Sequence, residues 1–299
     1  MQISNLETFL IMIKKYTLAI LIVIATAATS KAQEKEPERA VIDRLTDSVM
    51  AEGKALFRSE WASWHGTDIF LEKFKDRQSQ IGGYVSYETP TNLVNVFYTK
   101  GDKPLTMGVI SFGKDFNMQN YQIDTVPRPL NTIEQDLFSM RVAAAKALRA
   151  DTIFKLYNNV SFNVVPFINN GVKRIYILSA PNTLGVILFG NDYLLNVDSE
   201  NEVSSIKRIH NSLISTDTKK NDVKAIFHSH IPGKDETMSA TDICTLMLYE
   251  KENNLTQAYV ISKKYVSIWD CQKDILVVLT RKAWDRINND QKTRHPDKQ

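Results

Sequence analysis

The sequence predicts an α+β protein built on a mixed, largely antiparallel sheet flanked by helices. Apolar residues recur at helical spacing in long stretches, and other segments are short runs of β-branched and aromatic residues separated by Gly, Pro and Asp. The composition, 43% hydrophobic and 24% charged over 299 residues, is that of an ordinary globular protein with a substantial core. This length allows one large domain or two modest ones.

The N-terminus has the pattern of a secretory signal peptide. Lys14 and Lys15 precede the uncharged, mostly apolar run Tyr16–Ala28, and Ser30–Ala32 then supplies small residues at a cleavage site. The apolar run is shorter than the ~20 residues that a membrane-spanning helix needs. We therefore expect residues 1–32 to be removed and the mature chain to be exported from a bacterial cytoplasm to the periplasm or beyond, with no integral membrane segment left.

The charge of the mature chain is close to balanced. Removal of residues 1–32 takes away three lysines and one glutamate, which leaves 34 basic and 33 acidic residues. Such a chain has no excess of positive charge with which to bind nucleic acid or an anionic membrane surface. We expect neither as a partner.

Residues 33–150 predict a helix, a β-meander and a second helix. Apolar positions from Ala40 to Trp64 have helical spacing. Asn131, with Glu134 three residues later, is a capping pattern for the second helix, and this role explains Glu134 better than catalysis does. The strand signals of the meander lie at Tyr84–Tyr87, Leu93–Tyr98 and Leu105–Phe112.

Residues 151–290 form the second predicted region, and residues 291–299 a polar tail. A helix that begins at Ser239 and a short terminal helix from Ala283 accompany a set of strands. These strands are expected at Asp151–Ile168, Val172–Leu178, Leu184–Phe189, Asp192–Val197, Val203–His210, Val223–Phe227, Ala258–Ile261, Val266–Trp269 and Ile275–Leu279.

The pattern that carries chemistry is His228-Ser-His230, followed after a loop by Ser239-x-x-Asp242. Residues two apart on a strand share a face, and so do residues three apart on a helix. Two imidazoles and a carboxylate that meet in this way, with a fourth position for water, are a typical catalytic zinc site. The alternative is that Ser239 and Asp242 only form a capping box and that the two histidines are ordinary strand-end residues.

This pattern resembles the signature of the JAMM (MPN+, JAB-like) metalloprotease family, over roughly the last third of the chain. The strand before His228 and the hairpin Ala258–Trp269 resemble the corresponding elements of that family. The resemblance implies a JAMM-like C-terminal domain with Zn²⁺ held by His228, His230 and Asp242. It also implies that Ser239 donates to the oxyanion, and that the substrate is a peptide or protein cleaved at a peptide or isopeptide bond.

Two departures from the family pattern concern the loop and the proton shuttle. Ile231 stands where the family has Pro, and the loop is one residue longer. The family's catalytic Glu on an upstream strand corresponds here to Asn182. Another carboxylate would have to move the proton, and the nearby candidates are Glu236, which we name as the catalytic candidate, with Asp235 and Glu202 as alternatives.

Three further residues have open roles. His210 ends a strand shortly before the motif, so it is either a fourth ligand or outer-shell residue of the metal or an ordinary solvated histidine. Cys244 and Cys271 are the only cysteines, and they either pair, as export permits, or are two small buried thiols.

Two functions remain at this point. One is an exported, zinc-dependent hydrolase of peptide or isopeptide bonds. The other is a non-catalytic exported protein that keeps the fold for metal binding or for a role in the envelope. A carboxylate from elsewhere in the fold, within reach of the metal-bound water, would favour the enzyme.

Overall fold

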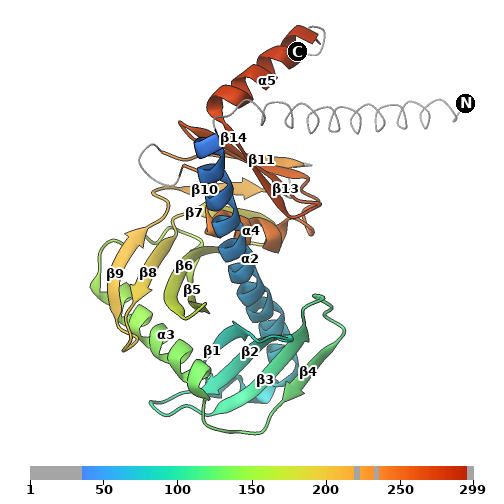
Figure 1. The fold of residues 1–299 in the computed structure, drawn as a ribbon. Helices are drawn as coiled ribbons and strands as arrows, with labels where there is room; N and C mark the ends of the chain where they lie inside the picture. The colour runs from blue at the N-terminus through green and yellow to red at the C-terminus, as the bar shows by residue number, and fades with distance from the viewer. Residues whose placement is uncertain (1–35, 219–222, 232–235, 295–299) are drawn as a thin grey trace, which may run out of the picture.

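A single long helix, α2 (Glu36–Lys73), runs through the molecule and connects its parts (Figure 1). The computed structural model describes residues 36–218, 223–231 and 236–294, so the predicted signal peptide and Asp235 lie outside the described residues. One end of α2 packs against α4 and the C-terminal sheet, and the other end packs against the N-terminal meander. The helix predicted from Ala40 to Trp64 is therefore confirmed but is longer at both ends.

Gly53 lies inside α2, where glycine normally weakens a helix. A Cβ added at this position would lie 2.7 Å from the Cβ of Ile243 and 3.0 Å from the Ala240 carbonyl oxygen, both on α4. The missing side chain thus lets α4 approach α2 closely. This contact places the start of α4, which carries Asp242, against the body of the protein.

The N-terminal sheet is an antiparallel meander in the order β1-β2-β3-β4. Its first three strands were predicted, whereas the short fourth strand was not. A short 3-10 helix, η1, leads into it, and α3 follows it. The bounds are η1 (Lys75–Gln80), β1 (Ile81–Glu88), β2 (Asn92–Thr99), β3 (Thr106–Gly113), β4 (Tyr121–Asp124) and α3 (Thr132–Ala150). Asn131 and Glu134 form a reciprocal capping box at the start of α3, which confirms the predicted role of Glu134.

A second antiparallel sheet has the order β5-β6-β8-β9. Its strands are β5 (Val160–Asn169), β6 (Val172–Pro181), β8 (Tyr193–Val197) and β9 (Val203–Arg208). The strand predicted to begin at Asp151 begins only at Val160. Asp151 ends α3 and its carboxylate accepts a hydrogen bond from the Ile153 amide at 2.9 Å, and Asn159 has a positive φ of 60°, so the segment between them is not extended.

The third unit contains the histidine motif. β7 (Val186–Gly190) pairs with β10 (Leu213–Asp217), and a four-stranded sheet has the order β11-β12-β13-β14. β11 pairs in parallel with β12, and the other pairs are antiparallel. The remaining bounds are β11 (Ala225–Ser229), α4 (Ala240–Tyr249), β12 (Gln257–Ile261), β13 (Tyr265–Asp270), β14 (Ile275–Thr280) and α5 (Arg281–Arg294).

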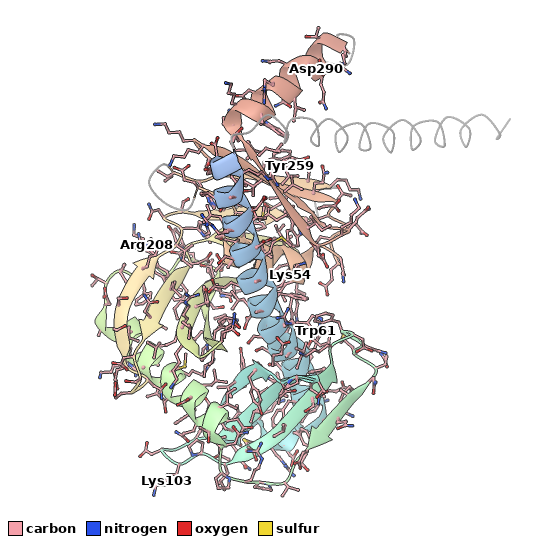
Figure 2. All side chains as sticks on the ribbon, viewed as in Figure 1. Lys54, Trp61, Lys103, Arg208, Tyr259 and Asp290 are labelled. Carbon is pink, nitrogen blue, oxygen red and sulfur yellow. The ribbon has the colours of Figure 1, made fainter. Side chains whose placement is uncertain are left out.

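The terminal helix α5 extends further than the sequence predicted. Residues 291–294, assigned to a polar tail, continue the helix, and residues 295–299 lie outside the described part. Ion pairs one turn apart, Arg281–Asp285 at 3.2 Å and Arg294–Asp290 at 3.0 Å, support these turns. Asp290, labelled in Figure 2, lies where α5 projects away from the sheets.

Buried side chains connect segments on either side of residue 150. One cluster joins Phe70 and Phe112 with Tyr176 and with Cys244 of α4. Trp61 packs edge-on against Phe112 at a centroid distance of 5.1 Å, on the half of α2 that faces the meander (Figure 2). The core around α2 therefore links the N-terminal region to the unit that carries the histidine motif.

The structure decides between the two alternatives for the cysteines. Cys244 and Cys271 are both free and buried, so they are two thiols rather than a disulfide.

Over residues 36–218, 223–231 and 236–294, no helix is both long enough and apolar enough to cross a membrane.

Candidate metal centre

The histidine motif lies at the end of β11, and the carboxylate lies in the first turn of α4. The His230 amide donates to the Ile261 carbonyl at 3.0 Å, which carries the parallel β11–β12 pairing one residue past the end of β11. Ser239 caps α4 and fixes the start of the helix. The two elements thus turn His228, His230 and Asp242 toward one another, as the motif predicted.

The three side chains meet at ligand-like distances. The Nε2 atoms of His228 and His230 are 3.3 Å apart. His228 Nε2 lies 3.4 Å from Asp242 Oδ1, and His230 Nε2 lies 3.4 Å from Asp242 Oδ2. Ligand atoms around tetrahedral zinc, with bonds of about 2.0–2.1 Å, are separated by roughly 3.4 Å. The geometry of this group therefore fits a zinc-sized ion.

His210 joins the same centre. It lies just after β9, and its Nε2 is 3.2 Å from His230 Nε2 and 3.7 Å from Asp242 Oδ2. His210, His230 and Asp242 form a second group of three ligands, with all donor atoms within 4.8 Å of one another. The two groups share His230 and Asp242. Of the alternatives that the sequence left open for His210, the structure places it beside the candidate ligands His230 and Asp242 rather than in solvent.

Asp192 supports His210 and was missed by the sequence reasoning. Its Oδ2 lies 3.0 Å from His210 Nδ1 and accepts a hydrogen bond from Thr241 Oγ1 at 2.8 Å. The carboxylate accepts, so His210 carries its proton on Nδ1 and turns the lone pair of Nε2 toward the centre. The sequence signal for Asp192 was its place directly after Gly190 and Asn191, two residue types that favour turns. In the structure both have positive φ, so the chain turns just before Asp192.

The capping box and the candidate ligand set are one structure. Asp242 Oδ2 accepts hydrogen bonds from the Ser239 amide and hydroxyl, both at 2.8 Å, and the Asp242 amide donates back to Ser239 Oγ at 3.1 Å. The capping box is therefore confirmed, and it leaves Asp242 facing the two histidines as a candidate ligand. The Ser239 side chain is buried and its hydroxyl is already bonded to the carboxylate, so in this structure it orients Asp242.

The charge state of Asp242 suits a ligand. Burial by itself would raise the pKa of this carboxyl group, because it disfavours the ionised form. The positive charge that His210 and His228 carry when protonated, together with hydrogen bonds from His228 and His230, outweighs burial and holds the pKa well below its usual value. Asp242 is therefore ionised while it is almost completely buried.

The nitrogens of the centre need a cation or a proton between them. His230 Nε2 has the Nε2 atoms of His210 and His228 and a carboxylate oxygen as close neighbours. Neutral imidazoles offer lone pairs at such contacts, and lone pairs that face one another repel unless a positive charge lies between them. Three imidazoles and a carboxylate are the donor types that zinc prefers.

A small pocket of about 40 Å³ opens beside the ligands. Besides His210, His228, His230 and Asp242, its walls include Phe189, Ile214 and Ile231. Its volume exceeds that of a single water, so an ion and a water or a small polar group fit. The exposed Ile231, at 58%, lies at the rim.

The residues proposed as proton shuttles lie elsewhere. Glu236 has Lys264 as an ion-pair partner at 4.0 Å, and Glu202 pairs with Lys146 at 3.7 Å. Neither lines the pocket, and Asp235 is outside the described residues. Asn182 is exposed and precedes the start of β7, whereas Phe189, at the far end of that strand, lines the pocket.

Comparison with known proteins adds no relative: no family model, no curated protein and no solved structure matches this chain. The likeness to JAMM metalloproteases therefore depends on the motif residues described above. The structure itself holds a His-His-Asp group that could bind a metal ion.

Proposed function

We propose that this protein is an exported, zinc-dependent hydrolase of peptide or isopeptide bonds. The observation that carries the proposal is the convergence of His228, His230 and Asp242 on one point beside a pocket. The bond class comes from the resemblance of this motif to the JAMM signature, and export comes from the N-terminal pattern. Zinc, when bound, would polarise a carbonyl and supply a nucleophilic water near neutral pH.

The His210–Asp192 pair replaces the missing glutamate in this proposal. The Asp192 carboxylate fixes the His210 ring, so that Nε2 offers its lone pair toward the pocket. An imidazole in this state accepts the proton of the attacking water and then returns it to the amine nitrogen of the leaving group. Such proton transfer contributes about 10²–10⁴ in rate. In this assignment His210 is the catalytic base, and Glu236, Asp235 and Glu202 have no part.

The second candidate is a closed metal centre with no catalysis. The observation that favours it is the 3.2 Å separation of His210 Nε2 and His230 Nε2, which is equally suitable for two ligands of one ion. Metal-bound histidines also commonly donate their other ring nitrogen to a carboxylate, as His210 does. Four protein ligands would leave no open position, as in structural zinc sites.

A comparison of zinc content and hydrolysis separates the two. The chain from Gln33 onward is loaded with zinc, and elemental analysis is combined with turnover of a mixed peptide library and of a lysine-linked isopeptide. The variants are Asp242→Asn, which keeps an acceptor for the cap, His210→Ala, and the control Asn182→Ala. For the enzyme we expect Asp242→Asn to lose both zinc and turnover, and His210→Ala to keep one zinc but lose at least about 10²-fold in turnover.

Two results would contradict the enzyme, and a third would contradict the choice of His210 as its base. No turnover in the zinc-loaded wild type, together with zinc loss in His210→Ala, would indicate the closed centre. Absence of stoichiometric zinc in the wild type would remove both candidates. Loss of activity in Asn182→Ala, at a residue that does not line the pocket, would show that His210 is not the residue that replaces the missing glutamate.

A further inference from the structure

A large cavity lies away from the candidate metal centre, over the described part of the chain. It has a volume of about 920 Å³ and is lined by the start of β7, at Val186 and Ile187, and by the end of α4, at Leu248 and Tyr249. The metal centre lies at the opposite ends of these two elements, at Phe189 and Asp242. A volume of this size is typical of sites that hold a small organic ligand.

The charged residues that line the cavity are all acidic. They are Glu60, Asp68 and Glu252, and no lysine, arginine or histidine is among the lining residues. Asp68 and Glu252 are exposed, but Glu60, on α2, is only 7% exposed. Buried carboxylates are normally paired, so Glu60 is the residue that needs an explanation.

One oxygen of Glu60 has no partner within the described part of the chain. Its Oε2 accepts a hydrogen bond from Asn163 Nδ2, and Asn163 Oδ1 accepts in turn from Tyr84 Oη at 3.3 Å. Glu60 Oε1 accepts no hydrogen bond from a described residue, and it is not among the fully buried polar atoms without a partner, so it is open to solvent. The nearest guanidinium, that of Arg141, is engaged by the Val164 carbonyl at 2.7 Å and lies 4.8 Å from the centre of the Tyr84 ring. It does not line the cavity.

Aromatic rings face the same space. Trp64, Tyr84 and Tyr249 line the cavity, and the rings of Trp64 and Tyr249 are 5.5 Å apart at an angle of 53°. Ring faces attract cations, with Trp the strongest. Apolar side chains, among them Val186, Ile187 and Leu248, also line the cavity and suit an aliphatic body.

We propose that this cavity binds an organic cation, an ammonium or guanidinium group on an apolar body, with Glu60 as its counter-ion and the Trp64 and Tyr249 rings as its aromatic walls. A bare metal ion would leave most of 920 Å³ unfilled and would gain nothing from the apolar wall. An anionic ligand would be repelled by the three carboxylates that line the cavity. The proposal is independent of the hydrolytic function, because the cavity shares no lining residue with the metal pocket.

Titration calorimetry tests the proposal with matched probes. The cationic probes are benzyltrimethylammonium and the blocked lysine Nα-acetyl-lysine amide, and the neutral probe is the same lysine acetylated on Nε. We expect saturable binding of the cations, accompanied by a change in Trp fluorescence, and at least about tenfold weaker binding of the neutral probe. Glu60→Gln should weaken the binding of the cationic probes about tenfold or more, because one charge pair is lost in a partly buried site.

Further variants keep the test independent of folding and of the metal. Glu252→Gln changes an exposed residue of the cavity and should weaken the binding of the cationic probes two- to threefold, roughly the contribution of an exposed charge pair. Glu200→Gln, in the β8–β9 turn, and Asp242→Asn, at the metal centre, should leave binding unchanged. The proposal is overturned if no cation saturates the protein at millimolar concentration, if the neutral probe binds equally well, or if a folded Glu60→Gln keeps full affinity.

Discussion

Asp192 Oδ2 lies 3.0 Å from His210 Nδ1, and the same oxygen accepts the Thr241 hydroxyl at 2.8 Å. One buried carboxylate therefore links the end of β9 to the first turn of α4. The hydrogen bond from Thr241 keeps Asp192 in place, and Asp192 keeps the His210 ring turned toward His230 and Asp242.

Replacement of Asp192 by asparagine should lower zinc affinity or turnover by about 10–100-fold, the usual cost of losing a carboxylate behind a metal-site histidine. The neutral amide holds the imidazole less firmly and does not stabilise its charged form. Zinc titration and steady-state turnover measure the two effects separately. Thr241→Val removes the hydrogen bond to Asp192 and a contact of 3.0 Å with the Ser239 hydroxyl, but leaves the Asp192 carboxylate, and it should have a smaller effect in the same direction. Wild-type values in Asp192→Asn would show that the pair has no role.

Zinc should stabilise the folded protein through the shared ligands His230 and Asp242. A ligand that binds only the native state adds about 2.7 kcal/mol at a hundredfold excess over its Kd, and this appears as a rise in Tm. His230→Ala and Asp242→Asn should abolish the rise. Ser229→Ala, which changes the exposed residue between the two histidines, should keep it. An equal rise in all four proteins would mean that zinc binds elsewhere.

Glu60 should make stability depend on pH near neutrality. Burial raises the pKa of Glu60 to about 7, with the Arg141 charge and the Asn163 hydrogen bond opposing it. Tyr84, Tyr249 and Cys244 also face this group. Because the folded-state pKa is raised, the native protein keeps the proton longer than the unfolded chain does. The free energy of unfolding therefore falls as pH rises from about 4.5 through 7, by up to ~3 kcal/mol if this group acts alone.

Denaturant unfolding at pH 5, 6, 7 and 8 measures this slope. Glu60→Gln cannot ionise, so its unfolding free energy should change less over that interval, whereas Glu200→Gln, with an exposed side chain, should follow the wild type. Parallel pH profiles for wild type and Glu60→Gln would contradict the assignment. A saturating organic cation should reduce the slope in the wild type if the cavity binds it as proposed.

Gly53→Ala tests the contact that positions α4. In an isolated helix this change would stabilise by about 0.5–1 kcal/mol. Here the new Cβ would lie 2.7 Å from Ile243 Cβ, and we expect destabilisation by roughly 1–3 kcal/mol, the usual cost of overpacking. Zinc affinity should also fall, since Asp242 lies one residue before Ile243. Urea unfolding and zinc titration measure both, with the neighbouring Lys54→Ala as a control; a gain in stability would contradict the close packing.

Much of the fold was predictable because it depends on local periodicity. The meander, the box of Asn131 and Glu134 and the long first helix follow from side-chain spacing and capping chemistry. The shared faces of His228 with His230, and of Ser239 with Asp242, follow from the same geometry. Two short strands, β4 and β10, were not predicted. The other errors came at boundaries: β5 begins at Val160 rather than Asp151, and α5 continues through a polar sequence.

By itself, the sequence determined the helices, most of the strands and which side chains of the histidine motif point the same way, because those properties depend on residues a few positions apart. Only the tertiary structure decided that His210 and Asp192 complete the centre and that Glu60 faces Tyr84 and Tyr249 across a cavity. These pairs come from separate strands and helices, and their distances are set by sheet pairing and by packing on α2. Sheet pairing and packing on α2 are not encoded in the spacing of neighbouring residues, so the local sequence pattern could not predict these distances.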